Sequence, residues 1–282
     1  MAQELAKTKR RISSVNSTLK ITKAMELVAN AKLKKWKNKM ENITIYLSEM
    51  SNIISSCANG VDTQETEIIE FKKFKNTEAI LYIVVTSSLG LCGGYNYSIF
   101  KFLNNKIKPQ DKVMIIGSKG LVKLSQNEID LDTDYVSILD KFDNSASNLL
   151  KGKIVEEYRT GKYKEVRLIS TVYKNSLTFI PQEFVILPLL PQDKKLKLEE
   201  IIFEPNEKEV LSLLIPKYLN TVLYGRLTEA IVCEYASRRN AMDTATDNAE
   251  ELSAKLMLEF NKARQQAITQ EISEIAGGAN NK

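Results

Sequence analysis

The first 59 residues contain neither glycine nor proline, the two residue types that most often interrupt a helix. Over this stretch a heptad pattern recurs with few exceptions, and a period of 3.5 sustained this long predicts a coiled coil rather than a short amphipathic helix. A helix of this length would extend for about 88 Å. The a positions are Leu5, Ile12, Leu19, Glu26, Leu33, Met40, Leu47 and Ile54, and the d positions are Thr8, Val15, Thr22, Ala29, Trp36, Ile43, Met50 and Cys57.

The other end of the chain has the same character. Asn206, with Glu209 three residues later, resembles a capping box, and Pro216 and Gly225 are expected to interrupt only the first turns of a helix over 206–276. We expect this helix to pair antiparallel with residues 1–59. Its predicted stripe, with one four-residue step after Leu256 that resembles a stutter, is Met242, Ala245, Ala249, Leu252, Leu256, Phe260, Ala263 and Ala267.

Both helices also carry apolar residues outside these seams. Ile21, Met25 and Val28 follow one another at i, i+4 and i+7 on a flank that the heptad does not use. The C-terminal helix has a similar surplus at Ile268, Ile272 and Ile275. Two interpretations remain open: a core wider than one seam, or a helical pair that is enclosed by partner subunits.

The middle of the chain has the pattern of a small α/β unit. β-Branched apolar segments at 79–87, 112–118 and 164–173 are separated by helix-length segments, which predicts parallel strands. The segment 176–187 is predicted to be an antiparallel edge strand, because Pro181 cannot lie in a central one. The predicted division is a helix at 1–59, a linker at 60–78, a Rossmann-like domain at 79–200, a helix at 206–276 and a tail at 277–282.

A glycine-rich segment, SSLGLCGGYN at 87–96, follows the first strand, where a phosphate can bind in related topologies. It lacks the G-x-G-x-x-G spacing and the P-loop lysine, so a tight strand-to-helix turn is the favoured interpretation. Cys92 lies near the expected helix start, where a thiolate is favoured, but the chain has no histidine to act as its base. We therefore expect no catalytic site, metal or cofactor.

Composition limits the remaining functions. The 282 residues are 43% hydrophobic and 27% charged, and the longest apolar run, 79–85, is far shorter than the roughly 20 residues of a membrane helix. Three scattered cysteines, Cys57, Cys92 and Cys233, favour a reduced cytosolic setting. The net charge of +5 is concentrated in residues 1–40, with eleven Lys or Arg and two Glu.

Four stretches resemble the gamma subunit of F-type ATP synthases, the central rotor stalk. They are ITKAMELVANAKL (21–33), GLCGGYN (90–96), LYGRLTEAIVCEYASRRNAM with ATDNA (223–249), and FNKARQQAITQEISEIAGGA (260–279). The resemblance extends from one end of the chain to the other and is weaker after Gly60 and between Leu121 and Arg159. It implies an antiparallel coiled coil inside a ring of three alpha and three beta subunits, with the α/β domain on the epsilon subunit and the membrane c-ring.

The resemblance also implies a non-catalytic subunit, peripheral on the cytoplasmic side of the cell membrane, and a set of contact residues. Met25 matches a methionine near the lever of the beta subunit, and Ile268, Ile272 and Ile275 match a tip that turns in an apolar sleeve. The expected contacts with the ring are Met25, Lys32, Lys35, Cys92, Glu234, Arg238, Gln265 and Thr269.

Departures from the family pattern leave an alternative open. Leu89 and Ser88 stand where the family has a base and an acid, and the chain ends in a polar NNK. These differences are compatible with a rotor in a diverged F-type-like ATPase whose output is not synthesis. A lower alternative, without the family, is a coiled-coil adaptor whose basic N-terminal helix binds anionic surfaces; for a rotor we expect no nucleic-acid binding.

Overall fold

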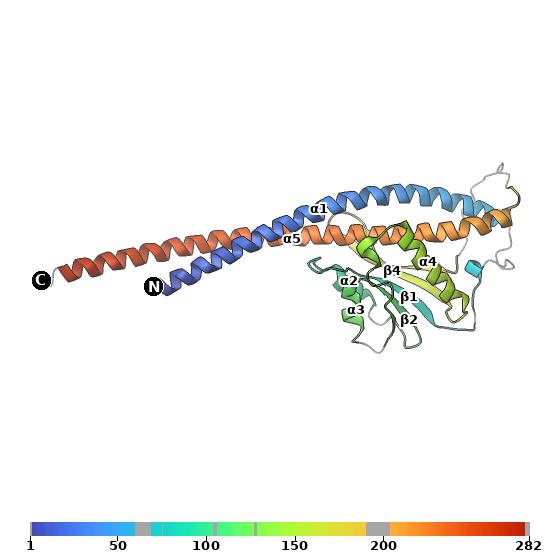
Figure 1. Ribbon diagram of the computed structural model, residues 1–282, viewed down its shortest axis with the longest axis horizontal. Helices are drawn as coiled ribbons and strands as arrows, with labels where there is room; N and C mark the ends of the chain where they lie inside the picture. Colours follow the sequence, from blue (N-terminus) through green and yellow to red (C-terminus); the bar gives the residue numbers. More distant parts are fainter. Residues whose placement is uncertain are drawn as a thin grey trace. The chain divides into compact units, whose positions relative to one another are not determined.

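The computed structural model describes residues 2–59, 69–74, 76–103, 106–126, 129–189 and 204–279 (Figure 1). The chain divides into two compact units, unit 1 with residues 1–30 and 238–282 and unit 2 with residues 31–237. Two long helices, α1 (Ala2–Asn59) and α5 (Glu207–Ala279), each contribute a segment to both units. Parts of the predicted linker, domain and tail lie outside the described residues, at 60–68, 190–200 and 280–282.

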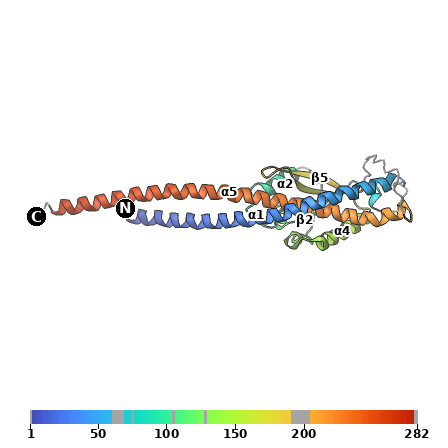
Figure 2. The same ribbon diagram turned by 90° about the horizontal axis from the view of Figure 1, so that it is seen from above.

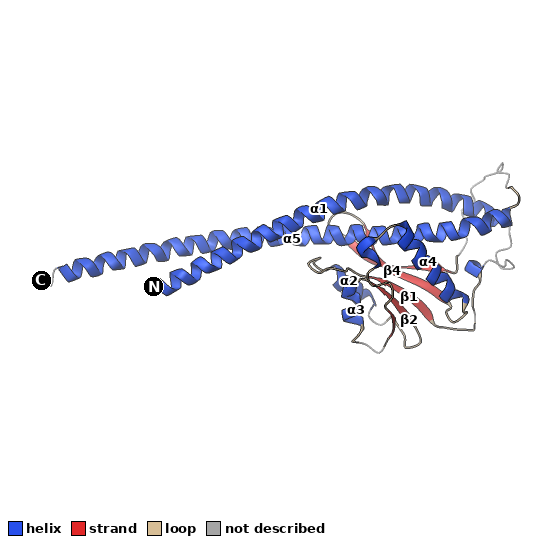
Figure 3. Ribbon diagram, in the orientation of Figure 1, coloured by secondary structure: helices blue, strands red, loops and turns tan. Residues whose placement is uncertain are grey.

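The heptad predicted for α1 is confirmed by burial. All sixteen a and d positions are buried or partly buried. In unit 2, the last turns of α1 pack with the first turns of α5, so the two helices run antiparallel there. The residues in contact are Met50, Ile54 and Cys57 of α1 and Leu211 and Ile215 of α5. Figure 3 shows both segments as continuous helices.

The start of α5 follows the prediction, and its first turns do not. The Asn206 side-chain oxygen accepts a hydrogen bond from the Glu209 amide at 2.9 Å, which caps the helix. The helix then continues through Pro216 and Gly225 without the expected interruption. A β-carbon at Gly225 would lie 3.0 Å from Leu47 and 3.1 Å from Ile43, so this glycine serves the close approach of α1 rather than a break.

Unit 2 contains a five-stranded sheet in the order β3-β2-β1-β4-β5. The strands β1 (Ile80–Val85), β2 (Lys112–Ile116), β3 (Asp130–Asp132) and β4 (Glu165–Tyr173) are parallel, and β5 (Phe179–Leu187) pairs antiparallel with β4. The parallel pattern and the antiparallel edge are therefore confirmed. The short strand β3 was not predicted, because its sequence Asp-Leu-Asp has no β propensity.

Helices cover both faces of this sheet (Figure 1). On one face, α4 (Asn144–Arg159) and the 219–231 segment of α5 share a core with β1, β2 and β4. On the other face, α2 (Tyr95–Leu103) and α3 (Ser118–Leu124) form a second core. Two short 3-10 turns, Ile69–Phe71 and Ile138–Lys141, complete the described elements of unit 2.

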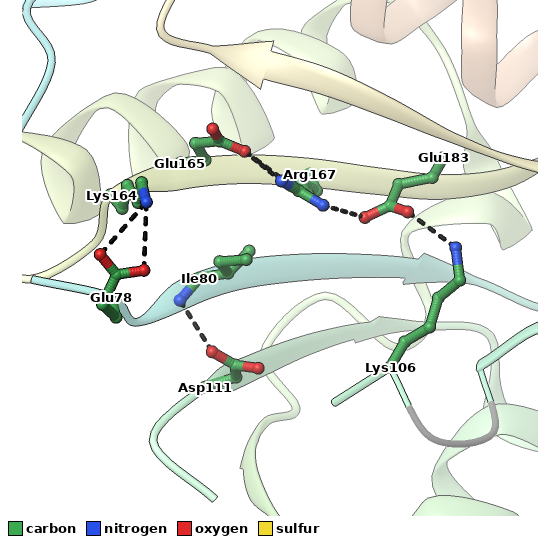
Figure 4. Close-up of polar contacts among 8 residues, drawn as sticks. All are labelled: Glu78, Ile80, Lys106, Asp111, Lys164, Glu165, Arg167 and Glu183. Atoms are coloured by element: carbon green, nitrogen blue, oxygen red, sulfur yellow. Dashed lines mark hydrogen bonds and ion pairs between the residues drawn. The ribbon is translucent and has the colours of Figure 1, made fainter. Parts of the chain in front are cut away.

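Charged side chains extend along one face of β4 and β5 as a ladder (Figure 4). Arg167 donates to Glu165 and to Glu183, the latter at 2.8 Å, and Glu183 also accepts from Lys106 at 2.8 Å. Burial of Glu183 favours its neutral form, but the hydrogen bonds from Lys106 and Arg167 outweigh that effect, so its pKa lies below its ordinary value. These charged side chains form ion pairs with one another, which indicates a structural role.

Gly117 should be intolerant of any side chain. It has φ 95°, and a β-carbon there would overlap the carbonyl group of Thr86. We expect Gly117→Ala to lower the free energy of unfolding by about 2 kcal/mol or more, measured by urea denaturation. Gly152 in α4 is the matched control, because nothing lies within 4 Å of its added β-carbon. Gly152→Ala should raise stability by about 0.5–1 kcal/mol, and an equal loss in both variants would contradict the argument.

Tyr158 links stability to alkaline pH. Its hydroxyl donates to the Lys72 carbonyl at 2.6 Å, and burial raises its pKa from 10.0 to about 12. The hydrogen-bonded phenol is therefore stabilising below pH 10, and this contribution is lost between pH 10 and 12 because the unfolded chain ionises first. Between these values, Tyr158→Phe should lessen the pH dependence of unfolding by about 1.4 kcal/mol per pH unit. Equal slopes of the free energy of unfolding against pH for the variant and the native chain would refute this role of Tyr158.

Candidate functional site

The seam of unit 1 combines hydroxyl-bearing, small and large apolar residues. Thr246 of α5 donates to Thr22 of α1 at 2.9 Å, and Ser253 donates to Asn16 at 2.7 Å. Thr22 and Thr246 are both buried, and the Thr22 hydroxyl donates in turn to the Leu19 carbonyl, so both hydroxyl groups are satisfied within the protein. The other buried residues of the seam are Ile12, Ala29, Met242, Ala249 and Leu256.

The burial pattern corrects the stripe predicted for α5. Leu252 is 42% exposed, while Thr246 is buried and Ser253 is partly buried beside Asn16. One series of buried and partly buried positions follows alternating steps of four and three without a break, so the predicted stutter after Leu256 is wrong. The series is Met242, Thr246, Ala249, Ser253, Leu256, Phe260, Ala263 and Ala267, and Ala245 and Asn261 beside it are also partly buried. The error arose because the prediction placed apolar residues in the seam and the chain places hydroxyls there.

Other large apolar side chains of unit 1 face outward. On α1, Ile21 is 60% and Val28 is 57% exposed, while Met25 between them is partly buried. The interpretation of this stripe as a wider core is therefore wrong for Ile21 and Val28. On α5, Met257 and Leu258 are exposed together with Leu252. A helical pair with leucine, isoleucine and valine side chains on its outside has a surface suited to enclosure by other proteins.

The C-terminal end of α5 has no α1 segment beside it. Asn16 lies opposite Ser253 and Thr22 opposite Thr246, so Ala2 lies opposite residues 266–267. The following residues of α5 extend beyond the described part of α1, and Figure 2 shows the red end of α5 past the blue end of α1. Ile272 is 62% exposed, and Ile268 and Ile275 are exposed with it. Gln265 and Thr269 are exposed on the same helix.

In unit 2, three predicted contact residues meet at one cavity. Lys32 and Lys35 of α1 and Glu234 of α5 line a space of about 760 Å³, together with Trp36, Leu89 and Lys141. Lys32 and Lys35 are exposed, whereas Glu234 is buried. The Lys32 ammonium lies 5.4 Å from the centre of the Tyr235 ring, a cation–π contact at the rim. Sequence patterns gave no sign of this cavity.

Cys92 is buried within unit 2, at 3% exposure. Its carbonyl accepts from Ser237 at 2.7 Å, and its sulfur accepts from Asn96 at 3.4 Å. The exposed side chains of this glycine-rich loop are Leu89 and Leu91, which are therefore what another protein could touch. Arg238, the first residue of the α5 segment in unit 1, is also buried.

The glycine-rich loop is closed by its own hydrogen bonds. The Ser87 amide donates to the Asn96 side chain at 3.0 Å, and Asn96 donates back to the Ser87 hydroxyl at 2.7 Å. Leu91 and Gly93 adopt φ of 60° and 54°, which turns the chain sharply into α2. This geometry agrees with a tight strand-to-helix turn.

Known proteins identify the family. The family model described as ATP synthase matches residues 4–281. An ATP synthase gamma chain from Mycoplasma capricolum is 36% identical over 99% of both chains, and one from Malacoplasma penetrans is 39% identical over 98% of both. The chain belongs to the family of ATP synthase gamma chains. It has the role of this family, the central rotor shaft of an F-type ATP synthase.

Solved structures agree with the gamma-chain fold. A chain of the Euglena gracilis mitochondrial ATP synthase superposes with a TM-score of 0.66 at 16% identity, covering 99% of this gamma chain and 95% of the other. A chain in a structure of the Tetrahymena thermophila central stalk and c-ring gives 0.55 at 21% identity, covering 80% and 99%. At these identities the likeness concerns the fold alone.

In the described part of this gamma chain, none of the helices combines the length and the apolar character of a membrane span. No group of three or more Cys, Asp or Glu side chains among the same residues is arranged to hold a metal ion. The three cysteines are free and buried, and burial raises the pKa of the Cys233 thiol to about 12.

The exposed isoleucines of the gamma-chain tip should be dispensable for its own folding. Ile272→Ser with Ile275→Ser should change the free energy of unfolding of the isolated chain by less than about 0.5 kcal/mol, because neither side chain is buried. Binding of a hydrophobic dye should fall. The control is Leu256→Ser at a buried seam position, which should cost about 2–5 kcal/mol in the same urea titration. A large loss from the tip variant would mean that these isoleucines pack within the chain.

Proposed function

We propose that unit 1 of this gamma chain turns inside a ring of three alpha and three beta subunits and is itself non-catalytic. The observation that carries the proposal is the apolar outer surface of the helical pair. Ile21, Val28 and Leu258 face outward, although the seam accommodates the hydroxyl groups of Thr22, Thr246 and Ser253. Exposed apolar surface on this scale is costly in water and favourable against a protein wall.

The shaft couples the ring's three catalytic sites through its asymmetry. Its two helices present different residues around the axis, so each surrounding subunit meets a different surface. A given angle therefore favours an open state at one site and a closed state at another, and ligand binding favours particular angles in return. Such coupling requires a stiff element. The unit 1 segments of α1 and α5 contain no proline, and their only glycines are Gly277 and Gly278 at the tip.

The tip serves as the bearing in this proposal. Ile268, Ile272 and Ile275 contact an apolar sleeve of the ring, while Gln265 and Thr269 make polar contacts with loops of the beta subunits. Both polar residues are exposed on α5 and available to a partner. Met25, which is partly buried between exposed Ile21 and Val28, contributes to the lever contact of a beta subunit.

The cavity of unit 2 receives charged segments of the ring. Lys32 and Lys35 supply two exposed positive charges at its edge, and Glu234 supplies a buried negative one. Acidic segments of the beta subunits are the complementary partners. The remaining surface of the α/β domain contacts the epsilon subunit and the c-ring, which holds the chain peripherally on the cytoplasmic side of the cell membrane without a cofactor.

Removing the outward apolar residues of α1 should weaken assembly. Ile21→Ser with Val28→Ser should lower the affinity for the ring about tenfold or more, because each side chain loses apolar burial in the complex. The measurement is the amount of tagged gamma chain that co-purifies with alpha and beta subunits. Ser14→Ala with Ser17→Ala, two exposed changes on the same helix, is the matched control. Equal recovery of both variants would contradict enclosure.

Purification from the native source under mild conditions tests the class itself. Three alpha and three beta subunits per copy would support the proposed shaft. A c-ring in the same complex would support the synthase, and a complex without one would favour the diverged ATPase rotor.

A further inference from the structure

The α5 segment of unit 1 is compatible with two different seams. Both use Met242, Ala249 and Leu256. One adds Ala245 and Leu252, which lie three residues after Met242 and Ala249, and the other adds Thr246 and Ser253, which lie four residues after them. The two seams differ by a rotation of α5 about its own axis of about 50°. The first is favoured by apolar burial alone. The structure adopts the second: Thr246 is buried, Ser253 is partly buried and Leu252 is exposed, while Ala245 is partly buried beside the seam.

The hydroxyl pairs are the feature that distinguishes the two seams. In the observed arrangement Thr246 donates to buried Thr22, and Ser253 donates to Asn16. Rotation of α5 toward the other seam would separate both pairs, and it would bury Leu252, now 42% exposed. Hydrogen bonds thus favour one orientation and the hydrophobic effect favours the other.

We propose that Thr246 and Ser253 are positioning residues that set the rotational orientation of α5 against α1, and that a second orientation with Leu252 in the seam is accessible. The consequence is a choice of outer surface. In the observed orientation Leu252 lies outside with Met257 and Leu258. In the second, Leu252 is buried and the side of α5 carrying Ser253 turns outward. The two-state element therefore changes the face that α5 presents without any change in the fold of α1.

Several neighbouring residues report on this rotation without any added label. Leu252 changes its exposure between the two orientations. Leu258 lies on the side of α5 away from both seams and is exposed in either. Leu256 belongs to both seams and stays buried unless the helices separate. Their relative oxidation by hydroxyl radicals distinguishes rotation from separation.

The test uses the full chain carrying Thr246→Val with Ser253→Ala, which removes both donors at nearly constant volume. We expect the oxidation rate of Leu252, relative to Leu258, to fall about threefold or more, because a partly exposed side chain becomes a seam residue. Helicity should be unchanged, and Leu256 should stay protected. The rescue variant is Thr246→Ser alone, with native Ser253. It retains both hydroxyl groups and should show the native pattern of Leu252 oxidation.

The matched control is Thr244→Val with Ser273→Ala, the same chemical changes at two exposed positions of α5. It should leave Leu252 oxidation at the native rate. Two results would overturn the proposal. Unchanged Leu252 oxidation in the donor-less variant would show that other contacts set the orientation. A joint rise at Leu252 and Leu256 would show that the hydroxyls hold the helices together rather than select between two seams. Neither result bears on whether the chain is a rotor shaft.

Discussion

The rest of this structure depends on the antiparallel pairing of the chain's two ends. Asn16 and Ser253 are separated by 237 residues, and Thr22 and Thr246 by 224. Closing a loop of that length costs conformational entropy, and two hydroxyl pairs at about 1 kcal/mol each do little to offset it. Unit 2 supplies the missing stabilisation, because it contains segments of both helices. Leu33 of α1 already packs with Val232 and Ala236 of α5 inside unit 2. The two helices therefore leave that unit as neighbours, and their further pairing is effectively local.

This dependence explains where one of the four family-like stretches lies. The stretch 223–237 is held by unit 2 on several sides. Tyr95 donates to the Ala230 carbonyl at 3.3 Å, Ser237 to the Cys92 carbonyl at 2.7 Å, and Cys233 to the Thr171 carbonyl. Tyr224 stacks on Phe142 with ring centres 5.2 Å apart. The motif fixes α5 to the sheet and to the glycine-rich loop, so its residues are constrained by packing whether or not a partner touches them.

The sequence predicted the elements whose signals are local. The α1 heptad, the β-branched strands and the Asn206 cap each depend on neighbours within a few residues, and each is confirmed. The α5 seam was mispredicted because that helix has two apolar faces, and the choice between them is made by Thr22 and Asn16, more than 220 residues away. The strand β3 forms because its backbone pairs with β2 in parallel register, which its own composition does not indicate.

The residues of the candidate site also fall into those that local sequence patterns predict and those that depend on tertiary contacts. Periodicity alone indicated a surplus of apolar residues at Ile21, Val28 and Ile272, and these side chains are exposed. Sequence periodicity is informative there because an outward face of a helix needs no tertiary contact to be recognised. Burial of Cys92 and Glu234, and the cavity beside Lys32, depend on how loops and helices of unit 2 meet. Resemblance to a family identifies such residues as constrained, but it does not say whether their side chains are buried or exposed.

The apolar outer surface of unit 1 has a thermodynamic consequence for the family role. A shaft with all its apolar residues in the seam would present a polar surface to its ring. Here Ile21, Val28 and Leu258 are outside, so part of the stabilisation of the helical pair comes from the surrounding protein. Binding to the native state then stabilises the helical pair by mass action, and folding of unit 1 becomes linked to occupancy of the ring. The hydrogen bonds from Thr246 to Thr22 and from Ser253 to Asn16 favour this arrangement because they place polar groups at two levels of the seam, while Ile21 and Leu258 remain for the interface.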